Sequence, residues 1–208
     1  VLGVVSPTYF WRLPRIVAAF LENIQMINCA YTFFVLSYGT TTGSAVHFTE
    51  KLMQENNQKF DAYYSVIMPD TWTPMFDLTD QKKVDAKLNE GEQQLQDIVQ
   101  KIQVNTNGDF VKGKLPVLIT ALPSLYMYHT ERKTKHLSVN KDICIGCGLC
   151  SKKCPVQAIA MKDSYPVWKD KECEMCLGCL HRCPKFAIQY GNGKTNKHGQ
   201  YRNPNTAI

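Results

Sequence analysis

Two cysteine runs in the C-terminal third of the chain constrain its fold more than any other feature. The first run reads Cys-x2-Cys-x2-Cys-x3-Cys-Pro over residues 144–155, and the second repeats this pattern over residues 173–184. Each cysteine of the first run recurs 29 positions later in the second. Eight of the nine cysteines therefore belong to one repeated pattern, which predicts two similar halves that fold together.

The spacing within each run is typical of thiolates that hold two 4Fe–4S clusters. Three thiolates of a tight loop converge on one cluster, and the fourth has to approach from the opposite side. In this pattern the fourth cysteine of each run ligates the other cluster. The expected ligand sets are Cys144, Cys147, Cys150 and Cys183 for one cluster, and Cys173, Cys176, Cys179 and Cys154 for the other.

Residues beside the ligands favour the same interpretation. Pro155 and Pro184 lack a backbone N–H and disfavour helix in the residue before them, so the chain is expected to leave each short helical turn there. Gly146, Gly148 and Gly178 are expected to ease the loop turns and to let backbone N–H groups point at sulfur.

Zinc and disulfide bonds are the two alternatives to iron–sulfur clusters. Zinc sites usually use two separated cysteine pairs, and two compact runs that each end in Cys-Pro fit that arrangement poorly. A disulfide framework requires an oxidising compartment, and nothing in the sequence indicates secretion. The cluster interpretation is therefore favoured, and the chain is expected to transfer electrons.

Residues 141–190, which contain both runs, resemble bacterial two-cluster ferredoxins, and all eight ligand positions are present. The formal net charge of the chain is +6. Because each oxidised cluster with its four thiolates carries roughly −2, the loaded protein is near about +2. This balance gives little support to a nucleic-acid partner, and none is expected.

The remaining composition indicates a reducing location. No apolar run approaches the roughly 18–20 residues that span a bilayer, so no membrane span is expected. No signal-peptide pattern is present. Reduced thiols and oxygen-sensitive clusters suit the cytoplasm of an anaerobe.

The first 125 residues alternate predicted strands and helices. Strands are expected at residues 1–5, 31–38 and 60–68, the first as a strand buried on both faces. Helices are expected from Pro14, from Ser44 to about Gln54, and from about Asp80 to Gln103. Such alternation predicts a parallel sheet, in which ligands bind at the carboxyl ends of the strands.

All three strands end in loops suited to an aromatic cofactor. These loops read Pro-Thr-Tyr-Phe-Trp over residues 7–11, Tyr-Gly-Thr-Thr-Thr-Gly over residues 38–43, and Met-Pro-Asp-Thr-Trp over residues 68–72. Two of these loops have aromatic side chains that are expected to stack on a flavin ring, and the hydroxyls and N–H groups of the middle loop are expected to bond the edge of the ring. Trp11 and Trp72 are equally compatible with ordinary packing at strand ends.

The whole chain resembles flavodoxin–ferredoxin fusion proteins of anaerobic bacteria and archaea. The stretches that carry the likeness are residues 7–17, the Tyr38-Gly39 loop, residues 68–70, Lys194-Thr195 and residues 201–204. The resemblance implies an incomplete flavodoxin-like parallel sheet with flanking helices (1–125), a linker (126–140), a ferredoxin domain (141–190) and a basic tail (191–208). The fold class is thus α/β plus α+β.

The same resemblance implies FMN as a third cofactor. The residues expected to bind it are Pro7, Thr8, Tyr9, Phe10, Trp11, Tyr38, Gly39, Thr40, Thr41, Gly43 and Trp72. The family's phosphate-binding loop, which would precede Val1, is not in this sequence, and N-terminal residues are expected to be missing. Residues 39–44 also follow a strand and open a helix, so they offer a second interpretation as a phosphate cradle, although the flavin-ring role is favoured.

Several features outside the cysteine runs have plain structural interpretations. Cys29 is expected to be a buried inert thiol, and His181 to lie at the surface. The basic residues from Arg132 to His136, with Lys141, are expected to form either a solvated linker or a docking patch for an acidic redox partner. The apolar run 115–122 fits either a strand or a helix. The tail is expected to be disordered by composition or, by its resemblance, to fold back onto the domains.

Three functions are consistent with these features. The favoured one is an electron-transfer protein with two 4Fe–4S clusters and FMN, which relays single electrons between redox partner proteins. The second is a flavin-dependent oxidoreductase that reduces a small molecule with electrons from its own clusters. The third is a plain ferredoxin with a docking domain that binds no flavin. Since no nucleophile or acid–base pair stands out, no catalytic residue is assigned.

Overall fold

The computed structural model describes residues 1–191 and 195–205, and it divides into two compact units. The first, here called the sheet unit, comprises Val1–Pro69 and Lys82–His129. The second, here called the cysteine unit, comprises Asp70–Gln81 and the chain from Thr130 onward. The chain therefore leaves the sheet unit after Pro69, returns to it at Lys82, and leaves it again after His129.

A four-stranded parallel sheet forms the centre of the sheet unit, as the sequence predicted. Its strands are β1 (Leu2–Pro7), β2 (Thr32–Tyr38), β3 (Ala62–Ile67) and the short β4 (Gly108–Asp109), in the order β1-β2-β3-β4. The second and third strands occupy the middle of the sheet and bury almost every residue, because helices cover both faces.

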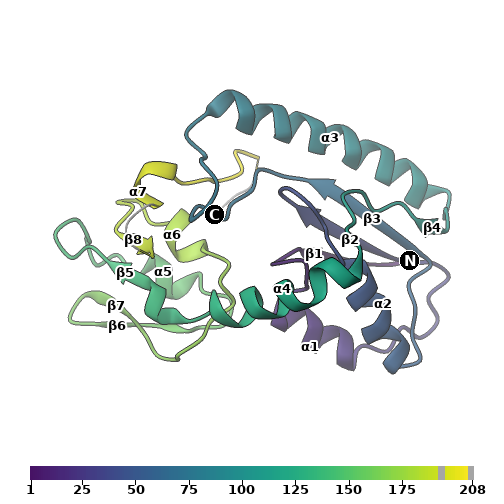
Figure 1. Cartoon of the computed structure of the whole chain (residues 1–208), viewed down its shortest axis with the longest axis horizontal. Helices are drawn as coiled ribbons and strands as arrows, with labels where there is room; N and C mark the ends of the chain where they lie inside the picture. Colours follow the sequence, from purple (N-terminus) through teal and green to yellow (C-terminus); the bar gives the residue numbers. More distant parts are fainter. Residues whose placement is uncertain (192–194, 206–208) are drawn as a thin grey trace. The chain divides into compact units, whose positions relative to one another are not determined.

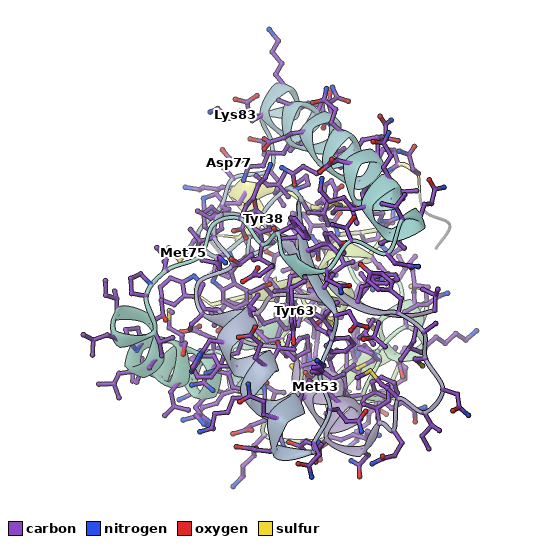
Figure 2. All side chains as sticks on the ribbon, turned by 90° about the vertical axis from the view of Figure 1, so that its right-hand side faces the viewer. Tyr38, Met53, Tyr63, Met75, Asp77 and Lys83 are labelled. Atoms are coloured by element: carbon purple, nitrogen blue, oxygen red, sulfur yellow. The ribbon has the colours of Figure 1, made fainter. Side chains whose placement is uncertain are left out.

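Helices α1 (Arg15–Asn23) and α2 (Ala45–Glu55) cover one face of this sheet, and α3 (Gln81–Gln103) covers the other (Figure 1). The α1/α2 face contains Leu21, Phe34, Leu36, Met53 and Tyr63, of which Met53 and Tyr63 are labelled in Figure 2. The α3 face contains Tyr31, Val35, Tyr64, Val66 and Ile98. The alternation of β2 side chains between two clusters follows from the two-residue period of a strand.

The first strand is an edge strand, and the expectation that it is buried on both faces is wrong. Among the described residues it pairs only with β2, from Leu2 opposite Thr32 to Pro7 opposite Ser37. Its burial alternates, and the side chains of Val1 and Val5 are exposed. An unbroken apolar run does not distinguish a central strand from an edge strand, because it carries no information about the number of neighbours.

The apolar run 115–122 contains the start of helix α4 (Val117–Thr130). In contrast to an ordinary surface helix, this helix buries polar residues and exposes apolar ones. Thr120 and Ser124 are buried, whereas Leu118 and Leu122 are 94% and 78% exposed. The buried hydroxyls make specific contacts, since Thr120 bonds Ser44 at 2.7 Å and Ser124 accepts from Nε of Arg12 at 3.0 Å. Polar contacts therefore fix this helix to its own unit, while apolar side chains face outward.

The cysteine unit consists of short elements around the two runs. They are the 3-10 helix η1 (Thr134–His136), β5 (Leu137–Val139), α5 (Leu149–Lys152), β6 (Ile159–Lys162), β7 (Tyr165–Trp168), α6 (Gly178–His181), β8 (Ile188–Tyr190) and α7 (Thr195–His198). Strand β5 pairs antiparallel with β8, and β6 pairs antiparallel with β7. Helices α5 and α6 carry Cys150 and Cys179, the third cysteine of each run.

Two further segments complete this unit beyond the expected limits of residues 141–190. The segment 70–81 contributes Trp72, which packs edge-on against Tyr190 with ring centres 5.0 Å apart. The expected linker 126–140 is occupied by the end of α4, η1 and β5. In the tail, residues 195–205 fold onto the unit, whereas Lys194, one of the residues that carry the family likeness, lies outside the described residues.

Across the described part of the chain, none of the helices combines the length and the apolar character needed to cross a membrane.

Candidate metal centres

Two hollows in the cysteine unit collect the eight cysteines of the repeated runs. The first, of about 390 Å³ and partly open to solvent, is lined by Cys154, Cys173, Cys176 and Cys179. The second, of about 350 Å³, is lined by Cys144, Cys147, Cys150 and Cys183. Each hollow thus contains three cysteines of one run and the fourth cysteine of the other, in the grouping that the spacing predicts.

Left-handed backbone positions shape the loop of each run. In the first run they fall on Gly146 (φ 64°) and Gly148 (φ 71°), which lie on either side of Cys147. The corresponding positions of the second run are Met175 (φ 52°) and Leu177 (φ 50°). Gly178 has no left-handed φ, although the sequence predicts that it eases the turn.

Backbone N–H groups point at several of the sulfurs. Ala158 donates to Sγ of Cys154 at 3.2 Å, and Ala187 donates to Sγ of Cys183 at 3.3 Å, so the two halves repeat the same contact. Met175 donates to Cys173 at 3.3 Å, and Gly178 to Cys176 at 3.5 Å. Hydrogen bonds of this kind favour the thiolate, which is the form that binds metal.

Burial acts against ionisation of the free thiols. It raises the pKa of Cys173 to about 11, and it raises the pKa of Cys150, Cys176 and Cys179 as well. Neighbouring cysteines add to this effect, because a second thiolate in the same hollow repels the first. A bound cation would remove both penalties, since a coordinating thiol is deprotonated outright.

The hollows fit a polynuclear cluster. Apolar side chains line the rest of both walls, among them Leu137, Ile159 and Trp168 in one and Met161 and Ile188 in the other. Four thiols around each space, N–H groups aimed at sulfur and apolar walls are the surroundings that a 4Fe–4S cluster uses.

The two loops differ in exposure although their backbones correspond. Ile145 in the first loop is 60% exposed, whereas Glu174, at the equivalent position of the second loop, is only 7% exposed. Cys147 is the one exposed cysteine among those described. The second loop is covered because Met175 and Leu177 join the apolar cluster of the unit, together with Leu180 and Ile188.

His181 lies between Cys179 and Cys183 and is buried, so the expectation of a surface position is wrong. Its Nε2 lies 2.9 Å from the carbonyl of Thr71, and its Nδ1 accepts a hydrogen bond from the N–H of Tyr201. Burial lowers the pKa of the imidazole, which favours the neutral ring that these two contacts require. The histidine therefore ties two distant segments to the helix that carries Cys179.

Arg132 also belongs to this site, although the cysteine motif gives no indication of it. The sequence places it in a basic linker, but its side chain is buried and donates from Nε to the carbonyl of Cys173 at 2.9 Å. No local signal separates it from the neighbouring Lys133 and Lys135, which are exposed.

The loops expected to bind flavin meet at the carboxyl ends of β1 and β2. Trp11 donates from its ring N–H to Thr41 at 2.8 Å, and its ring lies so close to Gly43 that an added Cβ would clash at 2.3 Å. Phe10 and Trp11 hold left-handed backbone angles (φ 50° and 64°), which are strained for aromatic residues. The buried hydroxyl of Thr8 makes no hydrogen bond to any described residue.

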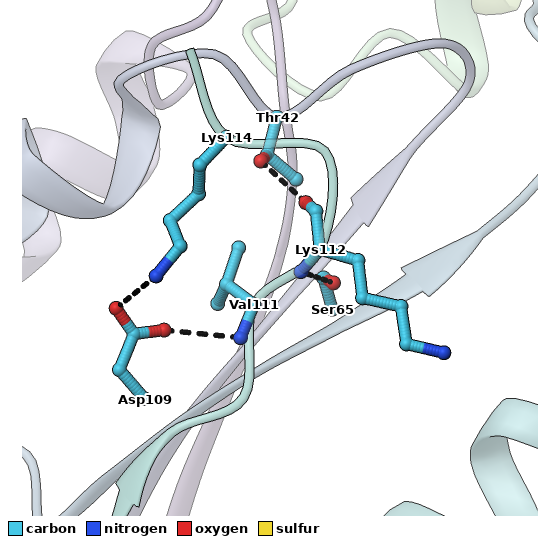
Figure 3. Close-up of polar contacts among 6 residues, drawn as sticks. All are labelled: Thr42, Ser65, Asp109, Val111, Lys112 and Lys114. Atoms are coloured by element: carbon cyan, nitrogen blue, oxygen red, sulfur yellow. Dashed lines mark hydrogen bonds and ion pairs between the residues drawn. The ribbon is translucent and has the colours of Figure 1, made fainter. Parts of the chain in front are cut away.

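Part of the middle loop is already engaged within the protein. The N–H groups of Thr42 and Gly43 both donate to the carbonyl of Gly113, at 3.0 and 3.2 Å. Figure 3 shows that the Thr42 hydroxyl reaches the carbonyl of Lys112, whose own N–H donates to Ser65. The ion pair of Lys114 with Asp109 (2.7 Å) holds the same stretch. Edge contacts to a flavin ring would therefore have to come from residues 38–41.

Two other predicted features lie apart from these loops. Trp72 belongs to the cysteine unit, where it packs against Tyr190. The structure therefore shows Trp72 as a packing residue. Cys29 is only partly buried, and its thiol lies 3.7 Å from the carbonyl of Ile27.

Comparison with protein families finds a match to the 4Fe-4S dicluster domain over residues 136–184, a range that contains all eight cysteines of the runs. Similar curated proteins include a ferredoxin of Pyrobaculum islandicum, which is 32% identical over 77 residues that make up 34% of this chain and 70% of the relative. An uncharacterised ferredoxin of Methanocaldococcus jannaschii is 38% identical over 63 residues (28% of this chain), and a polyferredoxin of Methanothermus fervidus is 36% identical over 55 residues (25% of this chain).

The chain spans 35% of the length of the Methanocaldococcus protein and 12% of the polyferredoxin. No solved structure matches the chain.

Proposed function

The chain belongs to the ferredoxins that carry a 4Fe-4S dicluster domain, and from this premise we propose that its cysteine unit relays single electrons between redox partner proteins. The proposal assigns one cluster to Cys144, Cys147, Cys150 and Cys183, and the other to Cys154, Cys173, Cys176 and Cys179. The carrying observation is that each of the two hollows is lined by one of these two sets. When bound, a 4Fe–4S cluster accepts and returns one electron at a time.

The residues of the chain supply the surroundings for this transfer. N–H groups of Ala158 and Ala187 stabilise negative charge on sulfur, and apolar walls keep water away from it. The exposed loop around Cys147 and Ile145 is the place where a partner can approach most closely. Lys185 lines the same hollow, which favours a partner with an acidic docking face. Because all eight thiols must stay reduced, the proposed location is the cytoplasm.

Anaerobic purification followed by metal and sulfide analysis tests the assignment. About eight irons per chain with matching sulfide are expected from two four-iron clusters. Cys29→Ser is the matched control and should retain all the iron, since Cys29 lies in the sheet unit. Stoichiometric zinc without iron would contradict the proposal.

The ligand grouping has its own test. Cys154→Ala should damage the cluster held by Cys173, Cys176 and Cys179 and spare the other. Electron paramagnetic resonance of the reduced variant separates the two signals. Loss of the signal that depends on Cys144 and Cys147 would refute the crossed arrangement.

A second candidate function adds FMN to the sheet unit, between the loops 7–11 and 38–43. It is favoured by the strained aromatic pair Phe10 and Trp11 and by the unsatisfied hydroxyl of Thr8, because strain and unsatisfied buried groups concentrate at ligand sites. Titration of FMN into the purified protein should then quench flavin fluorescence, and Thr8→Val should weaken the binding. Absence of quenching in the wild-type chain would leave a plain ferredoxin with a docking domain. Steady reduction of a quinone would instead indicate an oxidoreductase.

A further inference from the structure

Arg132 is hydrogen-bonded to the backbone of Cys173, the first cysteine of the second run. Its Nε donates to the carbonyl of Cys173 at 2.9 Å, while its own carbonyl accepts from the N–H of Cys173 at 3.0 Å. Next to it, the N–H and hydroxyl of Thr134 reach the carbonyls of Lys171 and Asp170, at 2.9 and 2.6 Å. These contacts hold the arginine beside the cysteine loop.

The guanidinium is a charge in a dry position, since the residue is only 4% exposed. Arginine does not lose its proton in proteins, so its burial is costly unless negative charge lies close by. Glu172 is one source, with Oε2 at 3.7 Å from Nη2, but its side chain is 40% exposed. The buried Glu174 lines the first hollow together with Cys173. Glu172 is therefore the carboxylate paired with the arginine, and Cys173, to whose carbonyl the arginine donates, belongs to the hollow that would hold negative thiolates.

The buried guanidinium therefore lies beside the backbone of Cys173, whose side chain lines the first hollow. The other site has no such residue at the corresponding contact. There the N–H of the first ligand, Cys144, donates to the carbonyl of Asn140, a neutral and exposed residue.

We propose that Arg132 raises the reduction potential of the site formed by Cys154, Cys173, Cys176 and Cys179, and not that of the other site. The inference rests on the proposed function. Each reduction adds one electron from an external donor and breaks no bond, so the site becomes more negative by one charge. A fixed cation with little water to screen it favours that extra charge.

Redox titration of the loaded protein, followed by electron paramagnetic resonance, tests the proposal. Arg132→Gln keeps an N–H donor and removes the charge, whereas Arg132→Lys keeps the charge. Arg132→Gln should lower the equilibrium constant for reduction of one cluster at least roughly tenfold, which is about 59 mV for a one-electron couple. That cluster should be the one whose signal is lost in Cys154→Ala. Arg132→Lys should retain most of the wild-type potential.

Lys133→Gln is the matched control. It also removes one positive charge, but Lys133 is the next residue along the chain and its side chain is exposed. It should leave both potentials within about threefold of wild type in equilibrium constant, since water screens it. An unshifted Arg132→Gln, equal shifts of both clusters, or equal shifts in Arg132→Gln and Arg132→Lys would overturn the proposal.

Iron analysis separates the possible failures. Wild-type protein without about eight irons would contradict the proposed function itself. If Arg132→Gln alone fails to bind iron, Arg132→Lys becomes the test. A tenfold fall in the equilibrium constant for reduction of the cluster in Arg132→Lys would then overturn the inference. If neither variant retains iron, the role of Arg132 is structural and the inference fails.

Discussion

At the scale of single residues, the two cysteine loops reach the same backbone geometry with different side chains. Gly146 and Gly148 take left-handed angles without a Cβ penalty, whereas Met175 and Leu177 take them at roughly 1–2 kcal/mol each. The second loop offsets this cost, because burial of a side chain such as Leu177 contributes about 1.5–3 kcal/mol. The repeat therefore preserves a conformation rather than a residue type.

The two glycines of the first loop should respond differently to the same change. An added Cβ at Gly146 would lie 2.9 Å from the carbonyl oxygen of Ser164, whereas at Gly148 nothing lies within 4 Å. Both Ala variants carry the left-handed penalty of about 1 kcal/mol, but only Gly146→Ala also displaces the β6–β7 turn. Gly146→Ala should lose its visible cluster absorbance faster in denaturant. Equal rates in the two variants would contradict this account.

Glu174 should act on the potential with a sign opposite to that of Arg132. It is buried against the first hollow, so Glu174→Gln removes negative charge and should raise the potential of the cluster there. Redox titration measures the shift, and Glu172→Gln is the control with a 40% exposed side chain. A larger shift in the control than in Glu174→Gln would show that burial does not decide the effect.

At the scale of elements, helix α4 shows where periodicity misleads. Its buried positions are Thr120 and Ser124, and its most exposed ones include Leu118 and Leu122. A pattern-based assignment places the leucines inside, because it assumes that apolar side chains face the core. In α4 the buried side is instead held by hydrogen bonds, from Thr120 to Ser44 and from Arg12 to Ser124.

Substitutions in α4 should therefore reverse the usual order of damage. Thr120→Val removes the bond to the buried Ser44 hydroxyl and should destabilise the chain by about 1–3 kcal/mol, the cost of an unsatisfied buried polar group. Leu122→Gln, at an exposed position, should change stability by less than about 0.5 kcal/mol. Urea unfolding followed by circular dichroism gives both values. Greater damage from Leu122→Gln would mean that the leucine face is covered in solution.

At the scale of the whole chain, the two units are interleaved in sequence. The segment 70–81 lies between β3 and α3 of the sheet unit but supplies Trp72 and the carbonyl of Thr71 to the cysteine unit. The tail adds Gln200, which donates to the carbonyls of Leu180 and Cys183. The cysteine unit is therefore assembled from two stretches of chain, and the cysteine motif is only part of the second.

Removal of iron should affect the two units unequally. The apolar clusters of the sheet unit contain no cysteine, whereas four cysteines lie around each hollow of the other unit. Without iron, thiols such as those of Cys173 and Cys179 have to remain buried, and burial raises their pKa. Hydrogen exchange after chelation should show lost protection in β5 and β8 and retained protection in β2 and β3. Equal loss in both units would contradict the division.

The sequence alone determined the features that depend on local spacing. Cysteine intervals predicted which four cysteines line each hollow, and strand–helix alternation predicted the parallel sheet with α1, α2 and α3. Both are local because a tight loop or a helical turn fixes the geometry within a few residues.

Only the tertiary structure decided which residues are buried by distant parts of the chain. Arg132 lies 41 positions from Cys173, and His181 lies 110 positions from Thr71. The edge position of β1 and the outward apolar face of α4 likewise depend on neighbours that no local pattern specifies. Charge and exposure around the two hollows follow from such long-range contacts, so the grouping of the cysteines was predictable, whereas the unequal exposure of the two loops was not.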